Sequence, residues 1–409
     1  MKVFIHLIVA LFFILSPFRT VAQTLSYGDS VVVSLLTCEP GDQVYERFGH
    51  TALRIRDANG RDMTYNYGIF NFNTEGFYLK FLRGHTDYLL GIYPTEYFLE
   101  DYRQRQSNVW EQVLNLTEVE KRRLIDLLNE NYLPANRTYR YNFVFDNCAT
   151  RPKVMIQNTL DGVLSYESAY YADTYRQLIH HYISDDAWLS LGIHLIFGTH
   201  SDRTVNQGGA AFLPELLRND LQQARIVKNA ADRNPRMLVT DTHLLEGPFA
   251  KQVISTPWWI HPLTIAVLWL VWGIVLTFSK NKRSKQSKSF DTILYVITAL
   301  AGILIFMLSF LSEHPMVGGN WNLLWLNPLN LLPAVFIWTH KARRFLLFYH
   351  AIYLLMILMA GCILALQVQV VPIAAFPVIL LLILRTSRRL KCLIKNHVEY
   401  SSGRWKWKN

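Results

Sequence analysis

FGHTALRI, residues 48–55, and YNFVFDNCATR, residues 141–151, are the two stretches that decide the fold. The first is an alternating apolar pattern, typical of a strand, that begins at His50. The second also alternates, and it ends in Asp-Asn, two residue types that cap helices, immediately before Cys148. A strand that starts with a histidine and a helix that starts with a cysteine predict an α+β domain in which the two side chains can meet.

The chemistry of such a pair depends on the position of the cysteine. A thiol at a helix N-terminus feels the positive end of the helix dipole, which lowers its pKa and favours the nucleophilic thiolate. A neighbouring imidazole lowers that pKa further and can later return the proton. We therefore expect an enzyme for acyl transfer or hydrolysis, with Cys148 as nucleophile and His50 as base, in the reverse chain order to papain. The backbone N–H of Cys148 is the first candidate oxyanion donor, and the side chain of Asn147 is the second.

A third polar residue should orient the imidazole, and the hairpin after His50 supplies two candidates. Residues 51–56 and 62–67 alternate on either side of the turn sequence DANG. A loop with an even number of residues places Tyr65 on the face of His50, whereas a one-residue slip places Asn66 there. The sequence favours Tyr65, with Asn66 as the alternative.

The region from residue 24 to residue 250 is long enough to bury a core of its own. Thr117-Glu118-Val119-Glu120 is a capping box that opens a helix, and Pro134 ends that helix. Strands or mixed segments are expected at residues 30–37, 77–83, 88–92, 109–114 and 139–145, and mainly helices at 147–160 and 166–225.

The net charge of +10 does not indicate a nucleic-acid-binding protein, because the charge is unevenly distributed. Residues 24–255 contain 23 Lys and Arg against 28 Asp and Glu, so this region is acidic. Sixteen of the basic residues lie beyond residue 255, between and after apolar segments. Such a pattern reports the orientation of membrane spans.

The N-terminus has the pattern of an export signal. Lys2 precedes an apolar run at residues 3–15, and Thr20-Val21-Ala22 is a small-residue cleavage site. We expect residues 1–22 to be a signal peptide and residues 24–250 to be a periplasmic catalytic domain.

Five later segments are apolar enough to span a bilayer, at residues 258–278, 290–311, 322–339, 345–365 and 367–384, although prolines interrupt the third and the fifth. Loops 280–289 and 340–344 carry five and three basic residues, and the chain from residue 385 onward carries eight. The positive-inside rule then places the C-terminus in the cytoplasm. We expect a multi-pass transmembrane domain over residues 256–385 in the bacterial inner membrane, followed by a basic cytoplasmic tail at 386–409.

The other cysteines and histidines supply weaker candidates. A disulfide between Cys38 and Cys148 is the alternative to a catalytic Cys148. His194, His200 and Asp202 match no zinc pattern, so no metal and no cofactor are expected.

Several motifs together resemble a known family: LLTCEPG at 35–41, FGHTALR at 48–54, YNYG at 65–68 and DNCATR at 146–151. They are similar to the DUF4105 domain, the periplasmic domain of the Lnb-type lipoprotein N-acyltransferases of Bacteroides. The C-terminal half is similar as well, including His314-Pro315 and Asn327-Pro328-Leu329.

This resemblance implies a circularly permuted papain-like fold of the NlpC/P60 type, with Cys148 as nucleophile and His50 as base. It also implies transfer of an acyl chain from a phospholipid, through a Cys thioester, to the α-amine of a diacylglyceryl-cysteine lipoprotein. The resemblance does not map a third catalytic residue onto this sequence.

Two other functions remain open at this point. The same Cys–His pair would serve a cysteine peptidase or amidase acting on cell-wall peptides, and a degenerate pair would leave a non-enzymatic membrane sensor. Outside the pair, Arg83, His314 and Asn320 are candidate substrate-binding residues, the last two because polar groups at the mouth of membrane spans are often functional.

Overall fold

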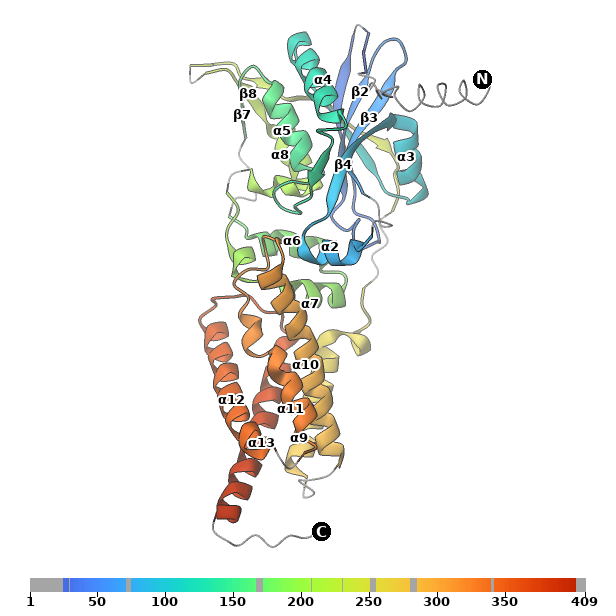
Figure 1. Cartoon of the computed structure of the whole chain (residues 1–409). Coiled ribbons are helices and arrows are strands. Elements are labelled where there is room, and N and C mark those ends of the chain that lie inside the picture. The colour runs from blue at the N-terminus through green and yellow to red at the C-terminus, as the bar shows by residue number, and fades with distance from the viewer. Residues whose placement is uncertain are drawn as a thin grey trace, which may run out of the picture.

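The computed structural model describes residues 25–28, 30–70, 75–166, 172–206, 208–229, 231–250, 255–279, 285–339 and 342–401. The expected signal peptide at 1–22 lies outside these residues. An α+β domain stands at one end of the molecule and a helical region at the other, with α6 (Tyr175–Ile183) and α7 (Ala187–Ile196) between them (Figure 1). The fold is therefore α+β with a C-terminal helical region, as the sequence predicts.

An antiparallel sheet of seven strands in the order β10-β5-β1-β2-β3-β4-β6 forms the centre of the α+β domain. Its strands are β1 (Val32–Cys38), β2 (His50–Arg56), β3 (Asp62–Ile69), β4 (Asp87–Pro94), β5 (Val109–Leu114), β6 (Thr138–Arg140) and β10 (Val239–Glu246). A smaller sheet joins β7 (Val163–Ser165), β8 (Arg225–Val227) and β9 (Arg236–Met237).

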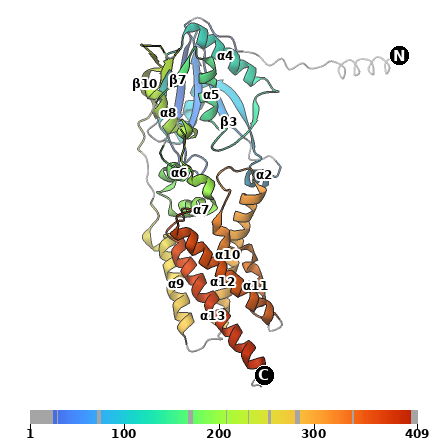
Figure 2. The same ribbon diagram turned by 90° about the vertical axis from the view of Figure 1, so that its left-hand side faces the viewer.

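Helices cover both faces of the seven-stranded sheet, which explains why its central strands are apolar almost throughout. Helices α4 (Glu118–Tyr132), α5 (Thr150–Thr159) and α8 (Pro214–Gln223) lie on one face and α3 (Thr95–Gln104) on the other (Figures 1 and 2). Leu53 of β2 packs in the core under the first three helices, whereas its neighbour Ala52 packs with the residues of α3. Successive side chains of β2 thus enter two different cores. The side chain of His50 lies on the same face of the sheet as that of Ala52.

Two segments differ from the expected secondary structure. Residues 77–83, expected as a strand or mixed segment, form the short helix α2 (Phe77–Arg83), which begins after Gly76 and ends at Gly84. The expected strand at 139–145 is only three residues long, because the chain turns back on itself between Asn142 and Asp146. This early turn is what brings Cys148 to the end of the sheet.

The helical region consists of α9 (Pro262–Phe278), α10 (Lys285–Leu311), α11 (Leu331–Phe336), α12 (Arg343–Ala365) and α13 (Ala375–Ser401). Among the described residues, α10 and α12 are long and apolar enough to cross a membrane, and α9 is a shorter apolar helix. The fifth helix starts later than expected and continues far into the basic segment. Pro377 lies in its first turn, where a proline costs little.

The third expected span, at 322–339, is broken into the short turns η4 (Trp321–Leu324) and η5 (Pro328–Asn330) and the helix α11. Asn330 is fully buried there, and its amide contacts Thr298, Tyr349 and Tyr353. An interrupted helix in an apolar region needs such polar partners for its freed backbone and side-chain groups.

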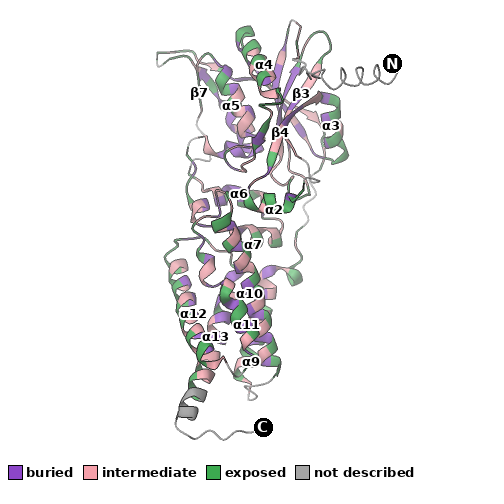
Figure 3. Ribbon diagram, in the orientation of Figure 1, coloured by how far each residue is buried: buried purple, intermediate pink, exposed green. Residues whose placement is uncertain are grey.

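Large apolar side chains cover the outside of the helical region. Figure 3 shows exposed bands on α9, α10 and α12. The exposed residues of these helices include Trp272, Phe310, Phe348 and Leu355. A water-soluble bundle would turn these side chains inward, so the exposed apolar surface fits a lipid environment.

The loop after α10 joins the two parts of the molecule. Gly198, which follows α7, donates its N–H to the carbonyl of Met316 at 3.0 Å. A Cβ on Gly198 would lie 2.0 Å from the carbonyl oxygen of Gly318, so the backbones approach as closely as glycines allow. The catalytic-site candidates are therefore held at a defined position relative to the helices.

Candidate active site

His50 and Cys148 meet at one end of the seven-stranded sheet. His50 is the first residue of β2, after Gly49, whose φ of 74° and close approach to the carbonyl of Cys38 exclude a side chain. Gly68 faces the imidazole from β3: a Cβ there would lie 2.8 Å from Cε1 of His50 and 3.7 Å from Cβ of Cys148. Glycine at position 68 thus leaves the space in which the two side chains meet.

Asn147 holds Cys148 at the start of α5. Its Oδ1 accepts hydrogen bonds from the N–H groups of Ala149 at 2.8 Å and Thr150 at 2.9 Å, which makes it the helix cap. Its amide donates both protons, to the carbonyls of Phe143 and Phe212. The expectation that this side chain is a second oxyanion donor is therefore corrected, because the side chain has no proton left to donate.

The electrostatics of the pair favour an ion pair of thiolate and imidazolium. Burial raises the pKa of Cys148, but the charge and hydrogen bond of His50 and the N–H groups of Thr51 and Cys148 lower it more. Burial lowers the pKa of His50, but the thiolate of Cys148 and the hydrogen bond to Asn66 raise it more. Each group thus shifts the pKa of the other toward its charged form, and both remain partly exposed.

The third polar group at the pair is Asn66, and Tyr65 lies elsewhere. His50 donates Nε2–H to Oδ1 of Asn66 over 2.7 Å, which leaves Nδ1 for the thiol. The hairpin closes between Arg56 and Asp62, so its loop has an odd number of residues and puts Asn66 on the face of His50. Tyr65 points into the opposite core, 3.2 Å from the hydroxyl of Tyr27. The preference for Tyr65, which assumed an even loop, is corrected by this register.

Three tyrosines surround the thiol on its other side. The pKa values of Tyr88, Tyr139 and Tyr141 are all raised. Burial is the larger cause, and the charge of the nearby Cys148 is the second. Tyr88 stacks on Tyr141 with ring centroids 4.2 Å apart. The cysteine therefore faces an aromatic wall of neutral phenols, a surface that suits an apolar substrate.

Sequence reasoning did not identify Gly68 and Tyr93 as parts of the site. The side-chain amide of Asn66 donates a hydrogen bond to the hydroxyl of Tyr93 at 2.5 Å, and this contact fixes the orientation of the amide. The motif YNYG was the available signal, since a glycine after three larger strand residues marks a close approach.

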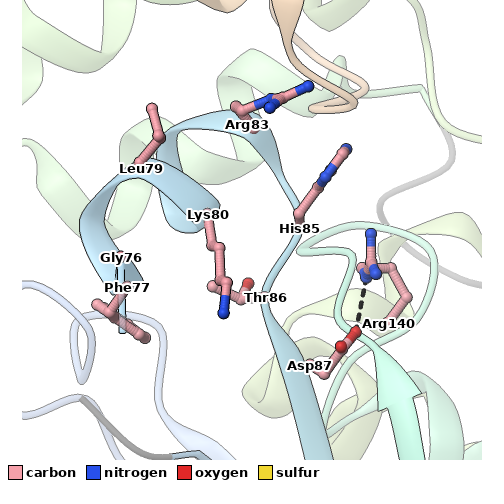
Figure 4. A pocket seen from close by; sticks show the side chains of 9 residues that line it. All are labelled: Gly76, Phe77, Leu79, Lys80, Arg83, His85, Thr86, Asp87 and Arg140. Atoms are coloured by element: carbon pink, nitrogen blue, oxygen red, sulfur yellow. Dashed lines mark hydrogen bonds and ion pairs between the residues drawn. The ribbon is translucent and has the colours of Figure 1, made fainter. Parts of the chain in front are cut away.

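Two of the candidate substrate-binding residues have structural partners. His314 contacts the carbonyl of Phe81 at 2.8 Å, and Asn320 donates its amide to the carbonyls of Leu195 and Ile196. His314 thus ties the loop after α10 to α2, and Asn320 ties it to the end of α7. Their role as substrate ligands stays a prediction. Arg83, in contrast, lines a cavity beside α2 (Figure 4).

Cys38, His194 and Asp202 have structural partners in the part of the chain that the structure describes. Cys38 pairs in register with His50 across β1 and β2 but is a free, buried thiol, and burial raises its pKa. Asp202 forms an ion pair with the buried Arg176 at 2.6 Å, and Arg176 also contacts His194. No group of three potential metal ligands occurs among the described residues.

The fold and the site define a class of protein: a Cys–His pair in an α+β domain attached to a C-terminal apolar helical region. Two family models match the chain, the Lnb N-terminal periplasmic domain over residues 20–182 and the Lnb transmembrane domain over residues 254–397. The chain belongs to the Lnb family and is an inner-membrane protein with a periplasmic N-terminal domain. No curated protein and no solved structure matches it.

Proposed function

We propose that this protein is a lipoprotein N-acyltransferase that carries the acyl chain on Cys148. The observation that carries the proposal is the contact of His50 with both Asn66 and Cys148 at the end of the domain that adjoins the helical region. A thiol activated in this way forms acyl thioesters, and the apolar helices of the same chain would hold the domain at the membrane that contains the acyl donors.

In the first half of the reaction, the thiolate of Cys148 attacks the ester carbonyl of a phospholipid. The backbone N–H of Cys148, at the start of α5, stabilises the oxyanion of the tetrahedral intermediate. The imidazolium of His50 gives its Nδ1 proton to the leaving alkoxide, so a lysophospholipid departs and an acyl thioester remains.

In the second half, the α-amine of a diacylglyceryl-cysteine lipoprotein attacks the thioester carbonyl. His50 accepts a proton from the attacking amine, the C–S bond breaks, and the N-acylated lipoprotein leaves. The thiolate and the imidazolium are thereby restored. Asn66 keeps Nε2 occupied, so that the same ring nitrogen faces the reacting atoms in both halves.

The fold is proposed to be a circularly permuted papain-like domain of the NlpC/P60 type. Its support is the order of the site residues along the chain, with the histidine and the amide on β2 and β3 before the cysteine at α5. Sites of this kind are defined by geometry rather than by chain order.

The membrane topology is proposed to have five spans, at α9, α10, the broken segment with α11, α12 and α13, with the C-terminus in the cytoplasm. The exposed apolar faces of these helices and the basic residues in the loops after α9 and α11 support it. Residues 1–22 are proposed as the signal peptide and residues 24–250 as the periplasmic domain.

The test is mass spectrometry of a lipoprotein N-terminus in cells whose only copy of the protein carries Cys148→Ala. We expect the N-acyl group to be lost, while Cys362→Ala, at an exposed cysteine of α12, retains it. Full N-acylation in the Cys148→Ala strain would refute the proposal.

A second measurement separates this function from a cysteine peptidase with the same pair. Purified full-length protein is mixed with phospholipid, and hydroxylamine then releases any acyl group from Cys148. An acyl thioester is expected from the transferase, whereas cleavage of muropeptides without an acyl thioester would favour the peptidase.

A further inference from the structure

A cavity of about 460 Å³ lies beside α2, outside the Cys–His pair. Its walls come from α2, the turn at His85, the start of β4 and the end of β6 (Figure 4). Lys80, Arg83, His85 and Arg140 line it, and Asp87 is the one carboxylate among its lining residues. Lys80 points toward Thr86, whereas Arg83 points the other way, beside His85 (Figure 4).

The charges of this cavity are only partly neutralised. Arg140 forms an ion pair with Asp87 at 2.7 Å, and Glu313, on the loop after α10, approaches His85 at 3.1 Å and Arg140 at 3.7 Å. Within the described ranges, no carboxylate forms an ion pair with Lys80 or Arg83. Two cationic side chains of one helix thus remain available to a phosphate group.

The same short helix turns apolar side chains outward. Tyr78, Leu79 and Phe81 are 83%, 56% and 52% exposed. The helix is tied to the outer end of α10, because Glu313 donates its N–H to the carbonyl of Arg83 at 3.0 Å (Figures 1 and 2). This helix thus combines two basic residues with exposed apolar ones where the helical region meets the periplasmic domain, as interfacial helices do.

A series of aromatic rings leads from the cavity to the thiol. Phe77, which lines the cavity, lies 6.1 Å from Phe70 between ring centroids, and Phe70 stacks on Tyr88 at 4.7 Å. Tyr88 in turn stacks on Tyr141, and both belong to the aromatic wall beside Cys148. A continuous cluster of aromatic rings thus connects the wall of the cavity to the rings near Cys148.

We infer that this cavity binds the phosphodiester of the phospholipid donor, an inference that rests on the proposed function. The positive charges of Lys80 and Arg83, which lie on two sides of the cavity, attract the phosphate oxygens. The rings of Phe77, Phe70 and Tyr88 contact the apolar part of the lipid whose ester reaches Cys148. Tyr78, Leu79 and Phe81 face the bilayer surface from which the lipid enters.

The experiment measures acyl-thioester formation on purified full-length protein with two donors. One is a phospholipid in mixed micelles, and the other is a p-nitrophenyl acyl ester, which has no phosphate. The double variant Lys80→Gln, Arg83→Gln is compared with a control, Lys121→Gln, Arg122→Gln, at two basic residues of α4.

We expect the cavity variant to lose at least about tenfold in rate with the phospholipid and to keep the rate with the phosphate-free ester, because two charge-assisted contacts are lost. The control variant keeps both rates. Equal losses with the two donors, or no loss with either, would overturn the inference.

Further arms separate the sources of failure. Inorganic phosphate in the millimolar range should not slow acylation by phospholipid, and strong competition by it would show a site for free phosphate instead. Wild-type protein that forms no acyl thioester with either donor would refute the proposed function. If the wild-type protein forms the acyl thioester and the cavity variant reacts with the two donors as the wild type does, only the inference about the cavity would be refuted.

Discussion

Replacement of Asn66 tests the arrangement of the site most directly. Asn66→Ala removes the acceptor 2.7 Å from Nε2 of His50 and leaves the fold of β3 intact. A hydrogen bond to a charged group contributes about 1.5–3 kcal/mol. Since about 1.4 kcal/mol corresponds to a factor of ten, the variant should lose about ten- to hundredfold in the reactivity of Cys148.

The sign of the pH effect follows from the same contact. The hydrogen bond to Asn66 raises the pKa of His50, so its removal lowers the fraction of imidazolium near neutral pH. Cys148 then loses part of the neighbouring charge that lowers its pKa, and its thiolate forms only at higher pH. The acid limb of the rate profile should therefore move to higher pH.

The assay is alkylation of Cys148 by iodoacetamide as a function of pH, on full-length protein in detergent, with mass spectrometry of the modified peptide. Asn66→Asp, which keeps an acceptor at this position, should retain most of the rate. Tyr65→Phe is the control, because its hydroxyl contacts Tyr27 in the other core. The reasoning would be refuted by wild-type alkylation in Asn66→Ala, or by an equal defect in Tyr65→Phe.

Three further replacements address the ion pair, the space around it and the helical region. His50→Ala removes the charge that lowers the pKa of Cys148 but not the burial that raises it, so alkylation should begin at higher pH; an unchanged onset in the pH titration would contradict the ion pair. Gly68→Ala puts a Cβ 2.8 Å from the imidazole and should slow alkylation while the circular dichroism spectrum stays the same. Asp291→Asn leaves the buried Arg385 without its carboxylate partner and should cost about 3–5 kcal/mol, seen as a lower Tm in detergent. Asp291→Leu combined with Arg385→Leu should recover part of that loss, and a normal Tm in the single variant would argue against the buried pair.

The sequence predicted the elements of the site better than their register. The alternating pattern at His50 and the Asp-Asn cap before Cys148 are local signals, and both depend on short-range physics that a sequence displays. The choice between Tyr65 and Asn66 depended on the hairpin loop, where one residue more or less exchanges the two faces of the strand. The loop between Arg56 and Asp62 has five residues, because the arginine after the DANG sequence also belongs to it. This odd number places Asn66 on the face of His50.

Helix α2 shows a second limit of sequence patterns. FYLKFLR was expected to be a strand or a mixed segment, but the glycines at positions 76 and 84 adopt left-handed conformations at its two ends and permit a single helical stretch. Phe77 is buried, whereas Tyr78, Leu79 and Phe81 point to solvent. A pattern of hydrophobicity alone does not distinguish a strand that packs inward from a short helix with exposed apolar side chains.

The structural contacts of His314 and Asn320 could not be predicted from the sequence for a different reason. Both were selected because polar groups at the mouth of membrane spans are often functional. Their partners are the backbone carbonyls of Phe81, Leu195 and Ile196, which no sequence pattern displays because every residue carries a carbonyl. The contact of His314 with Phe81 ties the loop after α10 to α2, the helix that carries Lys80 and Arg83. The contacts of Asn320 tie the same loop to the end of α7.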